Sequence, residues 1–178
     1  GDMPQDNLNR YAGIIHDEAI RLTRLLDDLL DLAVLENGQV ELHEQTGQLS
    51  DLLDRAVGAA GLHDGVLQVV RDRISEDITL STDLDRLAQV FINLIANARK
   101  YCNAADPTLT IRVAQLGGHV HVDFIDNGTG IAPENQALIF EKFSRVADEG
   151  KAGGAGLGLA ICREIMVRLG GEVMYLPL

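Results

Sequence analysis

A long helical pattern near the amino terminus constrains the fold more than any other feature of this 178-residue chain. Between residues 7 and 37, apolar side chains recur every three or four positions, and Gly38 follows where a helix would be capped. About 30 residues at 1.5 Å each give a rod of roughly 45 Å, with little globular core of its own to lie on. The pattern therefore predicts a helix of a bundle or coiled coil, with a core helix of a single domain as the alternative. The apolar stripe consists of Ile15, Leu22, Leu25, Leu26, Leu29, Leu32 and Leu35.

From Gly47 onward, shorter segments predict an α/β domain, with a boundary between the two parts near residues 38–48. Helices are expected over 49–60, with Ser50 as a possible N-cap, from a capping box at Thr82 and Asp85 to Tyr101, and over 155–169 before Gly170-Gly171. Strands are expected over 66–70, 78–80, 108–114, 118–126 and 172–176. Gly117-Gly118 is expected to turn the third of these strands into the fourth.

Composition excludes several classes of function. A net charge of −12 argues against a nucleic-acid footprint and against binding to an anionic membrane surface. No apolar run approaches the roughly 20 residues of a membrane span, and no signal peptide is visible. The two cysteines, Cys102 and Cys162, predict reduced, part-buried thiols in a cytoplasmic domain rather than a disulfide framework.

The most informative turn is the run 126–131, Asp-Asn-Gly-Thr-Gly-Ile, at the end of the strand expected over 118–126. The strand presents the Asp126 carboxylate at its tip, and Gly128 and Gly130 let the backbone approach a flat ligand closely. On its own such a string is most often an ordinary turn.

A second signal is a polar stripe on the helix expected to end at Tyr101. Gln89, Asn93, Asn97 and Lys100 fall within about 80° of arc, on a different face from the apolar residues of the helix. Amides on such a helix need polar partners, and a magnesium-bound polyphosphate supplies them, since amide oxygens suit Mg²⁺ directly or through its waters. The alternative is that the stripe faces solvent.

A third signal is the glycine series Gly154, Gly156 and Gly158 before the last helix, where free amides and the positive helix end favour phosphate. No Gly-Lys-Ser/Thr follows, so the series is not a Walker A loop.

Together with the run 140–143, Phe-Glu-Lys-Phe, these segments resemble in order and spacing the N, G1, F and G2 boxes of sensor histidine kinases. The resemblance extends from about residue 7 to residue 171. It implies an α/β two-layer sandwich, with a mixed, mostly antiparallel sheet and helices on one face. A long bundle helix precedes this sandwich in the chain. Residues 1–40 would be the second helix of a dimerisation hairpin, and residues 41–178 an ATP-binding catalytic domain whose last strands are cut short.

The resemblance also assigns roles. Asn93 and Asn97 hold Mg²⁺, Lys100 and Tyr101 lie near the phosphates and nucleoside, and Asp126 reads adenine. Related chaperone and topoisomerase ATPases carry a water-activating Glu where Asn93 stands, so this site is expected to bind ATP without hydrolysing it. One departure is Ala155, where the family usually has Thr or Ser. The implied catalytic residues are Asn93 and Lys100, and the other implied ATP contacts are Asn97, Tyr101, Asp126, Gly128, Gly130, Ile131, Lys142, Arg145, Gly154, Gly156, Leu157 and Gly158. Solvated surface charge is the alternative for Lys142 and Arg145.

No phosphoacceptor box, His-Glu-x-Arg-x-Pro, occurs in the chain. His16 comes nearest, His63 less so, and we expect the acceptor histidine to precede residue 1 of this chain in the parent protein. The implied function is transfer of the γ-phosphoryl group of ATP to that histidine for relay to a response regulator, by a homodimer joined through the long helix. The expected location of this part is the cytoplasm, whether or not the parent protein is a membrane-anchored sensor. The alternatives are a serine kinase of the anti-sigma type and a non-catalytic nucleotide-binding or dimerisation module.

Overall fold

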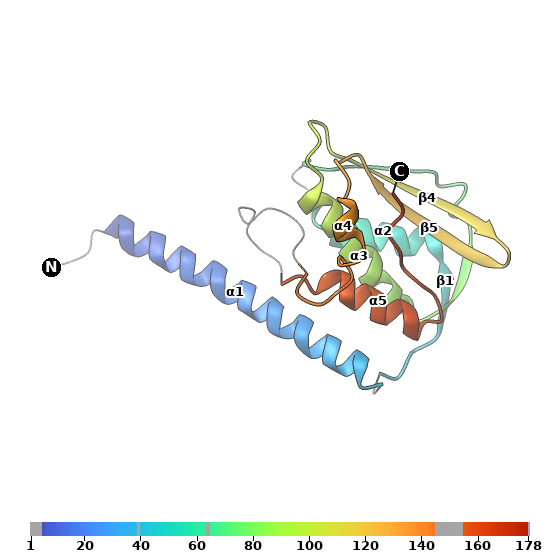
Figure 1. Ribbon diagram of the computed structural model, residues 1–178, viewed down its shortest axis with the longest axis horizontal. Helices are drawn as coiled ribbons and strands as arrows, with labels where there is room; N and C mark the ends of the chain where they lie inside the picture. Colours follow the sequence, from blue (N-terminus) through green and yellow to red (C-terminus); the bar gives the residue numbers. More distant parts are fainter. Residues whose placement is uncertain (1–4, 39, 63–64, 145–154, 178) are drawn as a thin grey trace.

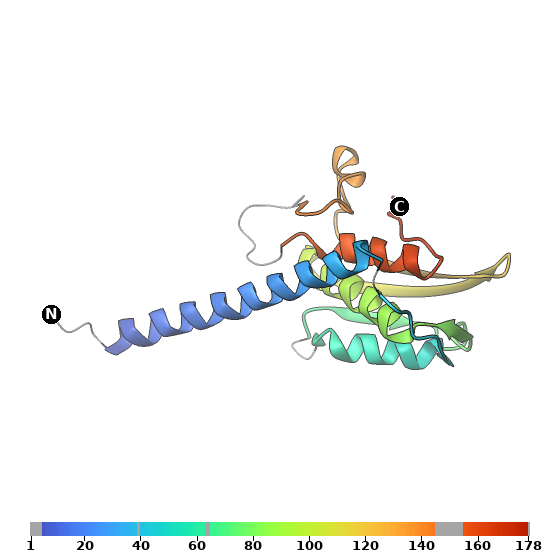
Figure 2. The ribbon, with the colours of Figure 1, turned by 90° about the horizontal axis from the view of Figure 1, so that it is seen from below.

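The computed structural model describes residues 5–38, 40–62, 65–144 and 155–177. One long helix, α1 (Gln5–Glu36), projects from an α/β body formed by the rest of the chain (Figures 1 and 2). The expected helix over 7–37 is therefore confirmed, and Gly38 follows it with a φ of 69°, as a glycine cap requires. Within the described ranges, no helix has both the length and the apolar character to cross a membrane.

Within the described residues, five strands form two sheets. In the larger one, β4 (Thr108–Leu116) pairs in parallel with β2 (Gln68–Arg71) and antiparallel with β5 (His119–Asp126). Gly117 and Gly118, both at positive φ, form the expected turn of the β4–β5 hairpin. In the smaller sheet, β1 (Gln45–Gln48) pairs antiparallel with β3 (Thr79–Thr82). The mixed, mostly antiparallel arrangement is as predicted.

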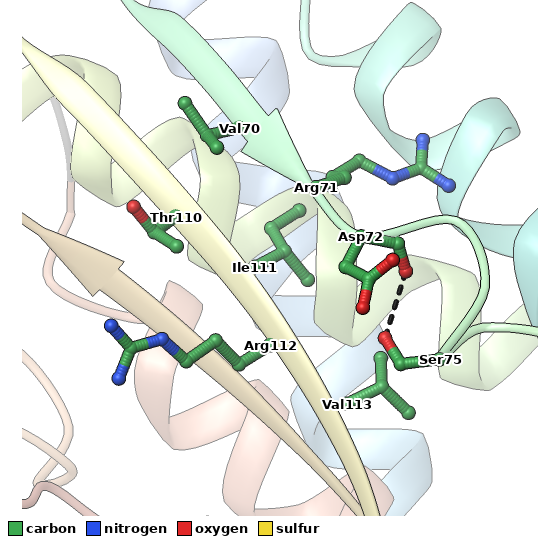
Figure 3. Close-up of a pocket in the computed structure, with 8 residues that line it drawn as sticks. All are labelled: Val70, Arg71, Asp72, Ser75, Thr110, Ile111, Arg112 and Val113. Carbon is green, nitrogen blue, oxygen red and sulfur yellow. Dashed lines mark hydrogen bonds between the residues drawn. The ribbon is translucent and has the colours of Figure 1, made fainter.

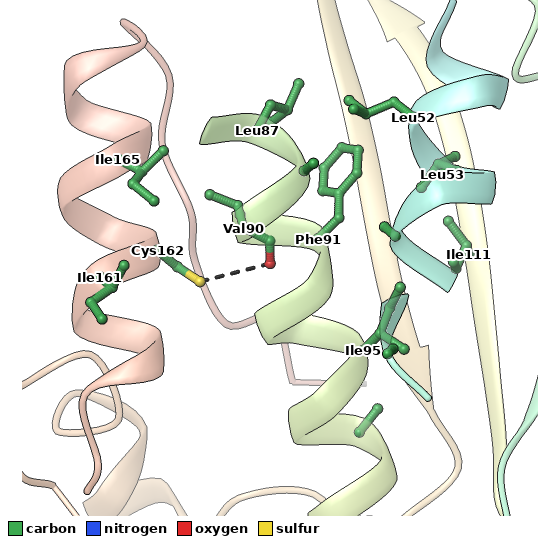
Figure 4. Close-up of a cluster of buried hydrophobic side chains, with 14 of the residues drawn as sticks. Leu52, Leu53, Leu87, Val90, Phe91, Ile95, Ile111, Ile161, Cys162 and Ile165 are labelled. Carbon is green, nitrogen blue, oxygen red and sulfur yellow. Dashed lines mark hydrogen bonds between the residues drawn. The ribbon is translucent and has the colours of Figure 1, made fainter. Parts of the chain in front are cut away.

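The helices of the body are α2 (Leu49–Ala59), α3 (Leu84–Tyr101), the short α4 (Pro133–Gln136) and α5 (Gly158–Arg168). In Figure 1, α2, α3 and α5 lie on one side of the β4–β5 hairpin. Their buried side chains form one core with the inner face of the sheet (Figure 4). Phe91 of α3 meets Phe124 of β5 there, with ring centroids 5.3 Å apart. Leu32 and Leu35 of α1 join the same core.

Two expected helix starts are wrong in detail. Helix α3 is capped by Asp83, whose Oδ1 accepts the Arg86 amide at 3.0 Å, rather than by a Thr82 capping box. Burial acts to raise the pKa of Asp83, but hydrogen bonds from the Arg86 and His43 amides outweigh it and lower the pKa below its usual value. Ser50 does not cap α2, because the helix already begins at Leu49, whose amide donates to the carbonyl of Ile78.

The last predicted strand is also wrong, since residues 172–177 form no strand. Helix α5 begins at Gly158, three residues after its expected start, and ends as predicted at Gly170-Gly171. The Gly171 amide donates to the Met166 carbonyl at 2.9 Å, and Gly170 has a φ of 77°. This is a Schellman ending, which turns the chain back toward the body.

Candidate nucleotide site

Helix α3 carries the predicted polar stripe into the middle of the fold. Asn93 Nδ2 donates to the carbonyl of Gly158 at 3.3 Å, so the stripe touches the first residue of α5. Asn97 and Lys100 follow on the next two turns, both half-buried. Lys100 Nζ donates to the Tyr101 hydroxyl at 2.8 Å and lies 4.6 Å from the centre of the Tyr101 ring. The two residues expected at the phosphates and nucleoside are therefore in contact with each other.

Gln89, the first member of the stripe, belongs to a different surface. Its side-chain amide nitrogen, Nε2, donates to Oδ2 of Asp31 in α1 at 2.6 Å, and Arg86 donates to Oδ1 of the same carboxylate at 2.7 Å. The stripe prediction is thus wrong at its amino-terminal end, because helix α1 satisfies Gln89 there.

Asp126 ends β5 on the face of the sheet that carries the core, directly opposite buried Leu109 in the β4 register. One carboxylate oxygen, Oδ1, accepts the Gly128 amide at 2.8 Å. A Cβ at position 128 would lie 2.7 Å from that oxygen and 3.4 Å from the Cα of Cys102, so a larger residue there would displace the Asp126 carboxylate. Ile125, the preceding residue, alternates to the other face of the strand.

The glycine segment before α5 contacts the Phe-Glu-Lys-Phe run. The Phe143 amide donates to the Gly156 carbonyl at 3.0 Å, and a Cβ on Gly156 would lie 2.6 Å from the Ser144 carbonyl oxygen. Gly156 has a φ of 71° and is required for this approach, whereas Phe143 adopts a φ of 60° without being glycine. Leu157 is buried at the start of α5. Arg145 and Gly154 lie outside the described residues.

Lys142 forms an ion pair with Glu36, the last residue of α1. In this arrangement its ammonium group neutralises a carboxylate of the long helix rather than facing the glycine segment. Nearby, Arg168 of α5 donates to the Leu35 carbonyl at 2.5 Å, so the end of α1 is held at two points.

Sequence reasoning missed Tyr175. Its hydroxyl accepts the Ile131 amide at 3.1 Å and lies 3.3 Å from where a Cβ on Gly130 would be. The chain after α5 thus returns to brace the 126–131 turn, which no local pattern around residue 175 signals.

Cys162 lies beneath Asn93 in the core, and its thiol donates weakly to the Val90 carbonyl at 3.8 Å (Figure 4). Burial raises the pKa of this thiol to about 12, although a hydrogen bond with Asn93 acts in the opposite direction. Cys162 is therefore a neutral packing residue at neutral pH.

A cavity of about 410 Å³ lies elsewhere, between the end of β2 and the edge of β4 (Figure 3). None of the predicted site residues lines it. Its walls are Val70, Arg71, Asp72, Ser75, Thr110, Ile111, Arg112 and Val113. Among the residues that the structure describes, no three His, Cys, Asp or Glu side chains gather as a metal site, so any cation here needs ligands of another kind.

Residues 82–176, more than half of the chain, match the family described as histidine kinase-, DNA gyrase B-, and HSP90-like ATPase. The match begins at Thr82, one residue before the Asp83 cap of α3, and includes the α3 stripe, the 126–131 turn and the glycine segment before α5. The chain belongs to this ATPase family.

Within this ATPase family, the chain is similar to curated sensor proteins and sensor kinases. Sensor protein VanS of Enterococcus faecium is 33% identical over 97% of this chain and 45% of its own length. Sensor protein kinase WalK of Staphylococcus aureus is 30% identical over 92% of this chain and 28% of its own length. The chain thus spans less than half the length of these relatives.

Solved structures agree with the fold. The histidine kinase AdeS of Acinetobacter baumannii has a TM-score of 0.69 and 25% identity, covering 93% of this chain and 75% of that one. Full-length ShkA, in a complex with AMPPNP, has a TM-score of 0.75 and 28% identity, covering 96% of this chain and 35% of that one. The resemblance to the ATP-binding catalytic part of a sensor histidine kinase is therefore confirmed.

Proposed function

We propose that this chain binds Mg-ATP against α3 and presents its γ-phosphoryl group to a histidine outside the chain. One observation carries the proposal: the amide stripe of α3 meets the amino-terminal end of α5 at Asn93 and Gly158, while the turn bearing Asp126 adjoins the carboxyl-terminal end of α3 at Cys102. The residue proposed to read the base, the backbone amides proposed to bind phosphate and the side-chain amides of the stripe therefore all lie next to α3. The complex of ShkA with AMPPNP is consistent with such a ligand.

The donor set fits Mg²⁺. Asn93 uses its Nδ2 on Gly158, which leaves the side-chain oxygen as the group to face a cation or its waters. Asn93 and Asn97 would hold the ion, which when bound neutralises charge on the phosphates. Lys100 would swing from Tyr101 to a phosphate, and Tyr101 would then cover the nucleoside.

The other proposed ATP contacts come from segments that follow α3 in the chain. Asp126 accepts the exocyclic amine of adenine, and Gly128, Gly130 and Ile131 let the turn lie close to the base. Gly154, Gly156, Leu157 and Gly158 give backbone amides to phosphate. Lys142 would reach the triphosphate only after its ion pair with Glu36 breaks. The contact of Arg145 with the triphosphate stays a prediction.

Asn93 argues for kinase chemistry, because an amide cannot act as the general base that water attack on ATP requires. Catalysis would then consist of positioning and charge neutralisation. His16, the best internal acceptor by sequence, is exposed on α1 without the family box around it. The acceptor, a response regulator that receives the phosphoryl group, and a homodimer joined through α1 are parts of this proposal. The division of the chain near residue 40 also remains a proposal.

A non-catalytic dimerisation module is the second candidate. The row of exposed apolar side chains on α1 favours it, as does the engagement of Lys142 by Glu36. The anti-sigma type of serine kinase is disfavoured, since it gives α1 no role.

Calorimetric titration with ADP and GDP, with and without Mg²⁺, tests the proposal. We expect Mg-dependent preference for adenine, lost in Asp126→Asn. Asn93→Ala should weaken Mg-nucleotide binding by more than it lowers the apo melting temperature, and the exposed control Gln115→Ala should change neither. Vigorous ATP hydrolysis, or equal affinity for both bases, would contradict the proposal. With γ-labelled ATP, stable base-resistant label on His16 would place the acceptor inside the chain instead.

A further inference from the structure

The side chain of Asn127 ties the turn that carries Asp126 to the segment after α3. Its Oδ1 accepts the Thr108 amide at 2.8 Å and the Cys102 thiol at 3.2 Å. Its Nδ2 donates to the Asp106 carbonyl at 2.9 Å, and its backbone amide donates to the Thr108 carbonyl at 3.1 Å. Both lone pairs of the side-chain oxygen and one of its two amide hydrogens are thereby used, so little remains for a ligand.

Asn103 makes the reciprocal connection from the α3 side. Its Oδ1 accepts the Thr129 amide at 3.2 Å, and its Nδ2 donates to the Thr129 hydroxyl at 3.2 Å. The two asparagines therefore hold the turn on either side of Gly128, at positions 127 and 129.

Asp126 lies immediately before the first of these attachments. Its Oδ1 is already fixed on the Gly128 amide, and within the described residues its Oδ2 accepts no hydrogen bond. The direction of that second oxygen follows from the backbone at 126–128, which Asn127 and Asn103 anchor to the end of α3.

We infer that Asn127, assisted by Asn103, is a positioning residue that aims Asp126 at the exocyclic amine of adenine and so sets base selectivity. Neither asparagine touches the nucleotide in this scheme. The inference rests on the proposed function, because it requires Asp126 to read the base. Both side chains are exposed, so water competes for their hydrogen bonds and the effect is moderate.

The test measures ADP and GDP affinities of the whole chain for the wild type, Asn127→Ala, Asn103→Ala and Gln115→Ala. Gln115 is an exposed amide at the far end of the same hairpin and serves as the matched control. We expect Asn127→Ala to weaken ADP binding about three- to tenfold, with a smaller loss for Asn103→Ala. GDP binding should change less, so that the selectivity ratio falls, while the control stays at the wild-type ratio.

A double-mutant cycle with Asp126→Asn decides whether Asn127 acts through Asp126. If it does, Asn127→Ala causes no further loss of selectivity in the Asp126→Asn background. An unchanged ADP to GDP ratio in Asn127→Ala, whatever its melting temperature, would overturn the inference and leave the proposed function intact. A wild-type chain without adenine preference would overturn both.

Discussion

The two parts of helix α1 share one apolar periodicity but have opposite surroundings. Leu32 and Leu35, in the last two turns, are buried in the common core. Leu22, three turns earlier, is 57% exposed, although it has the same residue type and spacing. The other exposed apolar side chains before residue 31 include Leu8, Tyr11, Ile14, Ile15, Leu26 and Leu30.

The polar contacts divide at the same place. Before residue 31, the Arg21–Glu18 ion pair, at 3.4 Å, stays within the helix. From Asp31 onward they join α1 to α3, α5 and Lys142. The last two turns therefore belong to the body, and Leu25 packs against the same core. Most of the other apolar side chains before residue 31 are exposed in the described chain.

The largest expected effect contrasts two leucines. Leu35→Ala should lower the free energy of unfolding by about 2–5 kcal/mol, because it leaves a cavity in a packed core. Leu22→Ala should change it by less than about 0.5 kcal/mol at concentrations where the chain is monomeric. Urea unfolding of both variants measures the difference. Equal losses would show that the two parts of α1 do not differ in the folded monomer.

The next effect concerns the polar connection to α3. Asp31→Ala should lower the free energy of unfolding by about 1–3 kcal/mol. The change removes the acceptor of two hydrogen bonds and leaves the half-buried Arg86 guanidinium without its carboxylate partner. Asp17→Ala, an exposed change on the earlier part of the same helix, is the control and should be nearly neutral. Thermal unfolding of both variants provides the measurement. A neutral Asp31→Ala would mean that the apolar contacts alone hold α1 to the body.

The smallest effect lies at the junction of the two parts, at Asp28. Partial burial first, and then the charges of Asp31 and Asp27, raise the pKa of this carboxyl group above 3.8. The folded state thus binds this proton more tightly than the unfolded state. At pH values where Asp28 is charged, it therefore destabilises the fold. Asp28→Asn should therefore stabilise the chain at pH 7, by about 0.2–0.5 kcal/mol for relief of like charges on a helix.

The pH dependence checks the sign of this effect. The gain from Asp28→Asn should vanish below about pH 3.8, where the wild-type carboxyl is protonated in both states. A gain that persists unchanged at low pH would assign it to helix propensity instead of charge.

Local pattern was sufficient wherever a local cause fixes the structure. The period of α1, the Gly117-Gly118 turn and the Gly170-Gly171 ending are all encoded within a few residues. Strand β1 was missed because Gln45–Gln48 has no apolar alternation and is a strand only through its pairing with β3. The 172–176 segment alternates weakly and finds no strand partner in the described structure.

The candidate site shows the same limit. The order of the motifs predicted which segments come together around α3, and Asn93 with Gly158 confirms one such contact. Nothing near Gln89 and Lys142 in sequence signals their partners Asp31 and Glu36, which lie on another helix. Asn127 lay inside a predicted turn. Its position next to a glycine was the only local sign that its side chain would form hydrogen bonds with nearby backbone groups.

The two cysteines make the molecule suited to spectroscopy. Cys162 is fully buried with a pKa of about 12, so a thiol-reactive dye has no access to a thiolate there at neutral pH. Cys102 is half-buried beside the turn that bears Asp126, and its thiol touches Asn127. A fluorophore attached through Cys102 would therefore sit at a single defined point of the chain, beside the turn proposed to read the base, where its emission can be followed during nucleotide titration.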